Sequence, residues 1–257
     1  MSAEINEVSP GVLRLTWSID LQESGVGPTS QATQAAVAAA FESGAHRIET
    51  LVDPDDPTAH RIAILTGFMR EGIARGVLDG VDRTIYARLS TDPPIAGPGG
   101  FRMLLNSFLP RKRAIGQMLI RDHANRVLLC ELTYKQDYDL PGGVVEVGES
   151  PHEATAREVT EELGLEIPAG DLILTDWLPP WGGWDDAVCL VFDGGAHDAV
   201  IEDQIVKQAR EIKAARFVSL EEAEALCADF TYRRIQAALA RLSGGGSAYT
   251  ESGRARD

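Results

Sequence analysis

Residues 143 to 165 read GVVEVGESPHEATAREVTEELGL, and the rest of the chain is organised around this stretch. Ser150 and Glu153 have the S-x-x-E spacing of a helix capping box, and Pro151 follows at the first helical position. Gly164 is placed to end the helix. The sequence therefore predicts a helix of about three to four turns between these two signals.

The predicted helix has an apolar face and an acidic face. Its apolar positions recur at i, i+3, i+4 and i+7, a spacing typical of a stripe that packs inward. They are Ala156, Val159, Thr160 and Leu163. Glu158, Glu161 and Glu162 share another face, where like charges repel by about 0.2–0.5 kcal/mol per pair. Such a group suits an oxygen-seeking cation such as Mg²⁺, or a solvent-facing helix of an acidic protein, and spacing alone leaves these interpretations equal.

A longer pattern includes this helix. Gly143, Glu149 and the run 157–165, REVTEELGL, match every fixed position of G-x5-E-x7-R-E-U-x-E-E-x-G-U. The match is highly specific because so many positions are fixed, and the stretch resembles the Nudix box of Nudix hydrolases. The preceding DLPGG, residues 139–143, also resembles that family. The resemblance covers residues about 111–242 and implies an α/β (α+β) fold, an α/β/α sandwich with a mixed sheet.

The resemblance also implies a metal-dependent pyrophosphohydrolase, with Mg²⁺ as the metal and Mn²⁺ as the alternative. The ligands implied in this sequence are the carboxylates of Glu158, Glu161 and Glu162 and the carbonyl of Gly143. A bound metal neutralises phosphate oxygens and lowers the pKa of a coordinated water. Arg157 is assigned to orienting carboxylates, either Glu149 or Glu161.

The general base is left between two glutamates. The segment that begins at Glu211 resembles the family pattern E-I-x-x-x-R-W-V, with Phe217 in place of the usual tryptophan. A glutamate in that region of the family supplies a base or a further metal ligand. Either Glu158 or Glu211 is therefore expected to take the proton of the attacking water, with coupled titrations.

Trp181 and Trp184 lie in a loop rich in proline and glycine, residues 178–186. Tryptophans in such a loop stack a nucleobase of the substrate or cover the end of the sheet, and both interpretations stay open. The expected substrate is a small nucleotide-type molecule: a nucleoside diphosphate linked to another moiety, as in a nucleotide, a sugar nucleotide or a dinucleotide.

The N-terminal part of the chain, residues 11–90, contains sequence patterns of strands and of helices in alternation. Strands are expected near 13–19 and 46–52, helices near 29–41 and 58–65, and a hairpin near 84–89. Gln22, Gly25 and Gly27, followed by HRIETLVDPDDPTAHRIAILTGFMREG from residue 46, resemble the second half of a GNAT-type N-acetyltransferase. In that family the corresponding turn holds the pyrophosphate of coenzyme A.

This small N-terminal α/β module departs from the acetyltransferase pattern. The family's first half has no room before Leu13, and Pro28 removes a backbone N–H where phosphate would bind. We therefore expect a truncated module with a structural, dimerising or degenerate role, and a homodimer is the partner that this role allows. Coenzyme A binding at Gln22, Gly25 and Gly27 is the alternative.

A run rich in proline and glycine, residues 91–100, marks a boundary. The expected organisation is a module at 1–92, a linker at 93–110, a Nudix domain at 111–242 and a disordered tail at 243–257. The second domain has further strand and helix signals. They lie at 114–120, 126–132, 172–177, 187–192 and 215–218 for strands and at 230–242 for the last helix.

Composition limits the function classes. The net charge of −15 argues against nucleic-acid and anionic-membrane binding, although a bound metal permits a nucleotide substrate. Cys130, Cys189 and Cys227 are expected to be reduced thiols. No secretory signal or long apolar run is visible, so a cytoplasmic location is expected. The alternatives to a hydrolase are a non-catalytic nucleotide-binding regulator and a coenzyme A-binding protein related to acetyltransferases.

Overall fold

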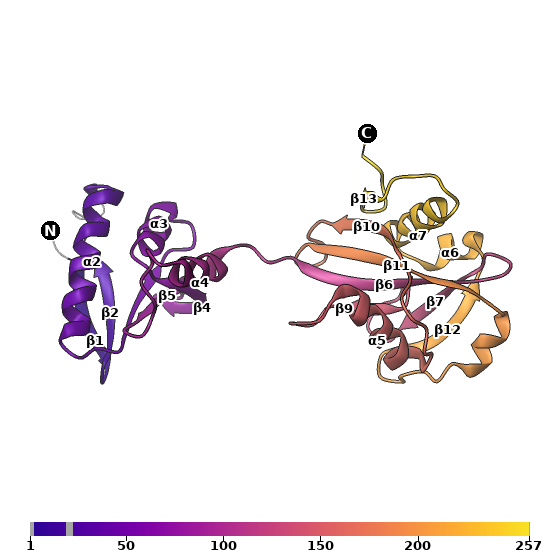
Figure 1. The fold of residues 1–257 in the computed structure, drawn as a ribbon, viewed down its shortest axis with the longest axis horizontal. Coiled ribbons are helices and arrows are strands. Elements are labelled where there is room, and N and C mark those ends of the chain that lie inside the picture. The colour runs from indigo at the N-terminus through magenta and orange to yellow at the C-terminus, as the bar shows by residue number, and fades with distance from the viewer. Residues whose placement is uncertain (1–2, 19–22, 257) are drawn as a thin grey trace. The chain divides into compact units, whose positions relative to one another are not determined.

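The computed structural model describes residues 3–18 and 23–256, and the chain divides into two units, 1–110 and 111–257 (Figure 1). The linker predicted for 93–110 is corrected, because α4 (Pro98–Phe108) forms there and belongs to the first unit. Pro98 takes an N-terminal position of this helix and Leu104 is buried. The proline and glycine run is therefore a helix start, where proline is tolerated.

The first unit has a five-stranded sheet in the order β1-β2-β3-β5-β4, in which only β2 and β3 are parallel neighbours. Its strands are β1 (Ala3–Ser9), β2 (Val12–Trp17), β3 (Arg47–Val52), β4 (Met69–Leu78) and β5 (Val81–Leu89). Its other helices are α2 (Val26–Glu42) and α3 (Pro57–Leu65). Strand β1 was not predicted, and α2 begins before Thr29, with Gly25 as its N-cap. Leu15, Ile48 and Phe68 form its fully buried core.

The second unit has an eight-stranded mixed sheet in the order β12-β7-β6-β11-β10-β13, with β8 paired to β7 and β9 to β6. Its strands are β6 (Arg113–Asp122), β7 (Val127–Leu132), β8 (Tyr138–Asp139), β9 (Gly142–Val144), β10 (Leu172–Leu178), β11 (Ala187–His197), β12 (Ile212–Val218) and β13 (Tyr249–Glu251). Its helices are α5 (Pro151–Leu163), α6 (Leu220–Leu226) and α7 (Asp229–Leu242), with a 3-10 helix at Ala199–Gln204.

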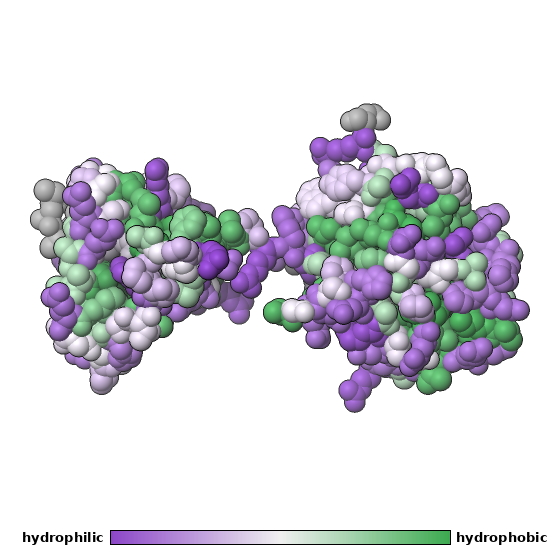
Figure 2. Space-filling model, in the orientation of Figure 1, coloured by the Kyte–Doolittle hydropathy of each residue, from purple (hydrophilic) through white to green (hydrophobic). Residues whose placement is uncertain are grey.

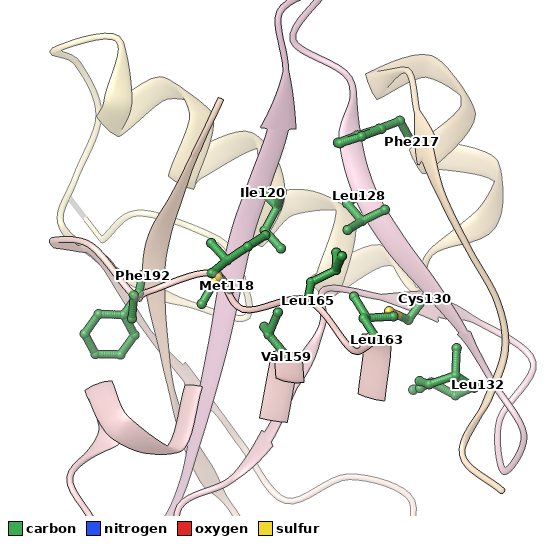
Figure 3. Close-up of a cluster of buried hydrophobic side chains, with 13 residues drawn as sticks. Met118, Ile120, Leu128, Cys130, Leu132, Val159, Leu163, Leu165, Phe192 and Phe217 are labelled. Atoms are coloured by element: carbon green, nitrogen blue, oxygen red, sulfur yellow. The ribbon is translucent and has the colours of Figure 1, made fainter. Parts of the chain in front are cut away.

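Helices cover both faces of this sheet. Alternation along β6 sends Met118 and Ile120 into one buried cluster and Leu119 into the other. Val159 and Leu163 of α5 pack into the first cluster, where Figure 3 shows them beside residues of β6 and β7. Helices α6 and α7 cover the second cluster. The second unit is thus an α/β/α sandwich, which confirms the predicted fold class.

The C-terminal segment is ordered by pairing with β10. Residues 243–257 were predicted to be a disordered tail, but β13 forms within them and runs parallel to β10. The buried carboxylate of Asp176 accepts hydrogen bonds from Thr250 Oγ1 at 2.7 Å and from the Gly253 N–H at 2.8 Å. The tail is corrected to an edge strand, because β10 offers it unpaired backbone groups and Asp176 offers it an acceptor.

The surface combines polar residues with exposed hydrophobic ones. In the face drawn in Figure 2, hydrophilic residues surround smaller apolar patches on both units. Cys130, Cys189 and Cys227 are all free and buried, as expected for reduced thiols. Across residues 3–18 and 23–256, no helix combines the length and the apolar character needed to cross a bilayer.

Candidate active site

The glutamate-bearing helix α5 has the two ends predicted for it. The Ser150 hydroxyl accepts from the Glu153 N–H at 3.2 Å, and the Glu153 carboxylate accepts from the Ser150 N–H at 3.3 Å. Gly164 ends the helix with φ 67° and donates to Thr160 O at 2.8 Å. Only glycine adopts this left-handed conformation at little cost. The local sequence therefore fixes where the acidic face begins and ends.

A Gly-Gly turn brings the backbone against that acidic face. Gly142 and Gly143 belong to β9, which pairs with Gln117 and Gly116 of β6. A Cβ atom at Gly143 would lie 2.5–2.7 Å from the carboxylate atoms of Glu158. Glycine is thus required for the Glu158 carboxylate to rest against the strand, which places the Gly143 backbone beside it.

The Gly142 N–H donates a hydrogen bond of 2.9 Å to Oε2 of Glu162. Glu162 is only 5% exposed. Burial raises the pKa of its carboxyl to about 8, and the charges of Glu158 and Glu211 act in the same direction, whereas the Gly142 hydrogen bond opposes the shift. Glu162 is therefore a buried carboxyl at the acidic face, and none of the residues that the structure describes forms an ion pair with it.

Arg157 is the cation that holds the outer glutamates. Its Nε and Nη2 donate to the two carboxylate oxygens of Glu149 at 2.8 and 3.1 Å. Its Nη1 lies 2.9 Å from Glu161 Oε2 and 3.0 Å from Glu158 Oε1. These carboxylates raise the pKa of the guanidinium, and Arg157 lowers the pKa of Glu149. The structure thus brings Arg157 to both of its predicted partners, Glu149 and Glu161.

Negative charge exceeds positive charge in this group. Three carboxylates, those of Glu149, Glu158 and Glu161, contact the single guanidinium of Arg157, and the buried carboxyl of Glu162 lies beside them against the Gly142 N–H. In the described part of the chain, no three His, Cys or acidic side chains already converge as metal ligands. The reason is local, because Arg157 and the Gly142 N–H engage the carboxylates instead. Their oxygens, with the Gly143 carbonyl, are donors of the kind that hard divalent cations take.

Glu211 approaches the group from another element. It lies in the exposed turn before β12, and its carbonyl accepts from the Thr133 N–H at 2.8 Å. Its charge contributes to the raised pKa of both Glu158 and Glu162. For Glu158 the largest cause of the raised pKa is burial, which Arg157 opposes. The sequence-predicted base candidates therefore lie within electrostatic reach of one another.

Sequence reasoning missed Tyr134, which follows β7. Burial and the charges of Glu162, Asp139, Glu211 and Glu158 raise the pKa of its hydroxyl to about 12. No motif marks this residue, because its neighbours come from β8, α5 and the turn before β12.

A buried polar network supports the turn from the other side. Asp139 accepts from Gln117 Nε2 and the Leu140 N–H, each at 2.9 Å, and from Lys135 Nζ at 2.5 Å. Burial opposes ionisation, but the charges of Lys135 and Arg234 hold the pKa of Asp139 below its usual value. This network fixes the DLPGG segment to β6, and Arg234 had no signal in the sequence.

The predicted tryptophans form a small hairpin loop. Trp181 and Trp184 exchange backbone hydrogen bonds of 3.1 and 2.9 Å, and both side chains are about 60% exposed. Trp181 contacts the Phe230 ring, with centroids 5.6 Å apart, and the Arg113 guanidinium lies 4.9 Å from the Trp184 ring. Among the described residues, no hydrogen bond or ring contact joins them to the glutamates.

The predicted coenzyme A turn is described only in part. Gln22 lies outside the described residues. Gly25 is the N-cap of α2 with φ 92°, and Gly27 lies in the first turn of that helix. A Cβ atom at either glycine would meet nothing within 4 Å, so neither position is demanded by packing.

The α/β/α sandwich that presents a glutamate-rich helix beside a Gly-Gly turn is the arrangement that the Nudix resemblance of the sequence implied. The family description "NUDIX domain" matches residues 110–239, which is 130 of 257 residues. The chain belongs to the Nudix family and is a pyrophosphohydrolase of that family. No match was found among the curated proteins.

Several solved structures resemble part of the chain. The MutT protein of Methanosarcina mazei Go1 is 26% identical, with 51% of this chain and 96% of that chain covered and a TM-score of 0.43. A UDP-X diphosphatase is 17% identical, covering 58% and 73%, with a TM-score of 0.45. An Ap4A hydrolase of C. elegans is 17% identical, covering 51% and 99%, with a TM-score of 0.42.

Proposed function

We propose that residues 111–242 form a Mg²⁺-dependent hydrolase that cleaves the diphosphate linkage of a nucleoside diphosphate joined to another moiety. The substrate class is a nucleotide, a sugar nucleotide or a dinucleotide, and Mn²⁺ is the alternative metal. The observation that carries this proposal is the excess of carboxylates over cations on the acidic face of α5. A divalent cation and a diphosphate together complement that charge.

Glu158, Glu161, Glu162 and the carbonyl of Gly143 are the proposed ligands of the metal. When bound, a divalent cation neutralises phosphate oxygens and lowers the pKa of a coordinated water. Support comes from the donor chemistry, which is all oxygen, and from the requirement for glycine at 143. The charges of Glu158 and Glu211 act on the buried Glu162 carboxyl, so a divalent cation bound there would offset their repulsion.

The remaining roles belong to side chains of the same group. Glu158 or Glu211 is proposed to accept the proton of the attacking water, since both lie at the acidic face and their charges interact. Arg157 is a positioning residue, because its guanidinium contacts three carboxylates and leaves little freedom for reorientation. These assignments require geometry that Arg157 and the Gly-Gly turn both help to fix.

The exposed rings of Trp181 and Trp184 are proposed to stack the base of the substrate. The contacts with Phe230 and Arg113 are also compatible with the rival role, in which the loop covers the end of the sheet. For the first unit we propose a structural or dimerising role. Coenzyme A binding stays a prediction there, with no further observation in its favour.

The test is a hydrolysis screen of the full chain with Mg²⁺ against nucleoside triphosphates, dinucleotides and sugar nucleotides, with the products separated by chromatography. Glu161→Gln is the matched control, since it replaces a largely exposed carboxylate with a group of equal size. We expect turnover of at least one diphosphate compound and its loss in the variant. If none of the compounds is hydrolysed although one of them binds to the chain in a separate titration, the result would favour the non-catalytic regulator.

A further inference from the structure

The first unit contains a groove between α2 and the segment that leads into α4. It has a volume of about 330 Å³. Val37 and Phe41 of α2 and Ile95 of the following segment supply apolar walls, and Gln34 and Arg88 supply the charged and polar groups. Pockets that hold small organic ligands have roughly 300–1,000 Å³ and few polar groups in an apolar lining, so this groove lies at the small end of that range.

Arg88 is the only charged residue of the lining. It is half-buried, and its Nη1 donates a hydrogen bond of 2.8 Å to the carbonyl of Thr66. Burial lowers the pKa of its guanidinium, and the charge of Asp92 opposes this effect only in part. Within residues 3–18 and 23–256, no carboxylate lies within 4.0 Å of Arg88. The groove is therefore lined by a guanidinium that has no ion-pair partner among the described residues and that Asp92 influences only from a longer distance.

The other half-buried arginines of the first unit are paired. Arg14 lies 2.6 Å from Glu49, Arg47 lies 2.6 Å from Glu71, and Arg83 lies 3.8 Å from Asp53. Withdrawing a charge from water is costly unless an opposite charge or hydrogen-bond acceptors compensate it. Arg88 departs from the pattern of its own unit, and it does so in the lining of the groove.

We propose that this groove binds a small carboxylic acid, with the carboxylate on Arg88 and an aliphatic or aromatic body against Val37, Phe41 and Ile95. The planar guanidinium matches a carboxylate with two parallel hydrogen bonds. One cation in a chain of net charge −15 disfavours a polyanion such as a nucleotide. The apolar walls disfavour a sugar or another strongly hydrated body. The site is independent of the hydrolase proposal.

Calorimetric titration of the full chain with hexanoate and phenylacetate tests the site, with hexanamide as the neutral control of equal shape. We expect saturable binding of at least one acid with a Kd of about 1 mM or lower. We expect hexanamide to bind about tenfold more weakly or worse, since charge-assisted hydrogen bonds are lost. Equal binding of hexanoate and hexanamide, or no saturable binding of either acid, overturns the proposal.

Two variants separate the groove from a surface effect. Arg88→Gln keeps an N–H for the Thr66 carbonyl but removes the charge, and we expect about a tenfold loss of affinity for the acid. Ala38→Trp adds a ring at an exposed lining position of α2 and should block the groove with Arg88 intact. Thermal unfolding confirms the fold of each variant. If either variant folds and still binds the acid with unchanged affinity, the result contradicts the proposed binding site.

Discussion

The N–H of Gly142 and the carboxylate of Glu162 are 2.9 Å apart, although 20 positions of sequence separate them. This hydrogen bond joins the turn before α5 to the last turn of the helix. It explains why the Gly-Gly pair and the glutamates act as one unit. It also makes the backbone conformation at this turn a condition for the acidic face.

Gly143→Ala tests the close approach at this turn. The new Cβ would lie 2.5–2.7 Å from the Glu158 carboxylate, which must move away. Because a displacement of about 1 Å can cost about a hundredfold in rate, we expect kcat to fall by roughly that factor. Stability should change little, since the clash is with the end of a flexible side chain.

The matched control is Gly245→Ala. A Cβ atom there would meet the Ala240 carbonyl at 3.6 Å, an ordinary contact. Its kcat should equal that of the unmodified chain. Wild-type kcat in Gly143→Ala would refute the close approach of Glu158 to the strand.

Arg157→Lys tests the positioning of the glutamates. Lysine keeps the charge but cannot hold both oxygens of Glu149 and reach Glu161 with a planar fork. Residues that orient metal ligands typically change affinity or activity by about 10–100-fold, so we expect a loss in that range. Exposed ion pairs contribute only about 0–1 kcal/mol, and the melting temperature should change little. Full activity with a shifted metal dependence would be inconsistent with this role.

Asp122 lies outside the glutamate group and is expected to make the stability of the fold depend on pH. Burial would raise its pKa, but hydrogen bonds from the backbone and side chain of Arg126 and from the Ala124 N–H hold the pKa below its usual value. A lowered folded-state pKa gives stability that is present above the unfolded value of about 3.9 and is lost as the pH falls through the folded value.

We therefore expect Asp122→Asn to lower the free energy of unfolding by about 1 kcal/mol or more at pH 7. This gap between the unmodified chain and the variant should close in strong acid. Urea unfolding at several pH values measures it. Asp203→Asn, at an exposed position, is the control and should show no such gap. A gap that does not depend on pH would rule out the ionised Asp122 as its source.

Thr250→Val tests the ordered C-terminal strand. Valine keeps the shape of threonine but removes the 2.7 Å hydrogen bond to the buried Asp176. Loss of one such bond to a charged group should cost about 1.5–3 kcal/mol in the free energy of unfolding. Ser247→Ala, at a half-buried position before β13 whose hydroxyl bonds only to the backbone of Tyr249, should cost less because no charged group is involved. Equal free energies of unfolding for the two variants would contradict the ordered C-terminal strand and would support the disordered tail that the sequence predicted.

The sequence predicted α5 well, because its start and its end are marked by nearby residues. It predicted poorly the elements that depend on residues far away in the chain. The capping box at Ser150 and the terminal Gly164 are encoded within a few residues, and both ends of the helix are confirmed. Strand β13 was missed because it exists only where β10 offers a free edge, more than 70 residues earlier in the chain. Helix α4 was missed because its Pro98 start was interpreted as a linker.

The candidate site also combines residues that a local motif identifies with contacts that depend on distant parts of the chain. The identity of the glutamates followed from the box, whereas the hydrogen bond from Gly142 to Glu162 depends on how β9 pairs with β6. Tyr134 and Arg234 carried no motif, because their partners come from distant strands and helices. The glutamates of the candidate site can therefore be named from the sequence, whereas the pairing of strands determines their surroundings.

The most direct test of the central claim is the initial rate of diphosphate hydrolysis by the unmodified chain and by Glu161→Gln, each measured as Mg²⁺ is titrated. We predict a rate that requires Mg²⁺ and falls by about a hundredfold or more in the variant, with an unchanged melting temperature. A rate in Glu161→Gln close to that of the unmodified chain at every Mg²⁺ concentration would contradict the assignment of the acidic face of α5 as the active site.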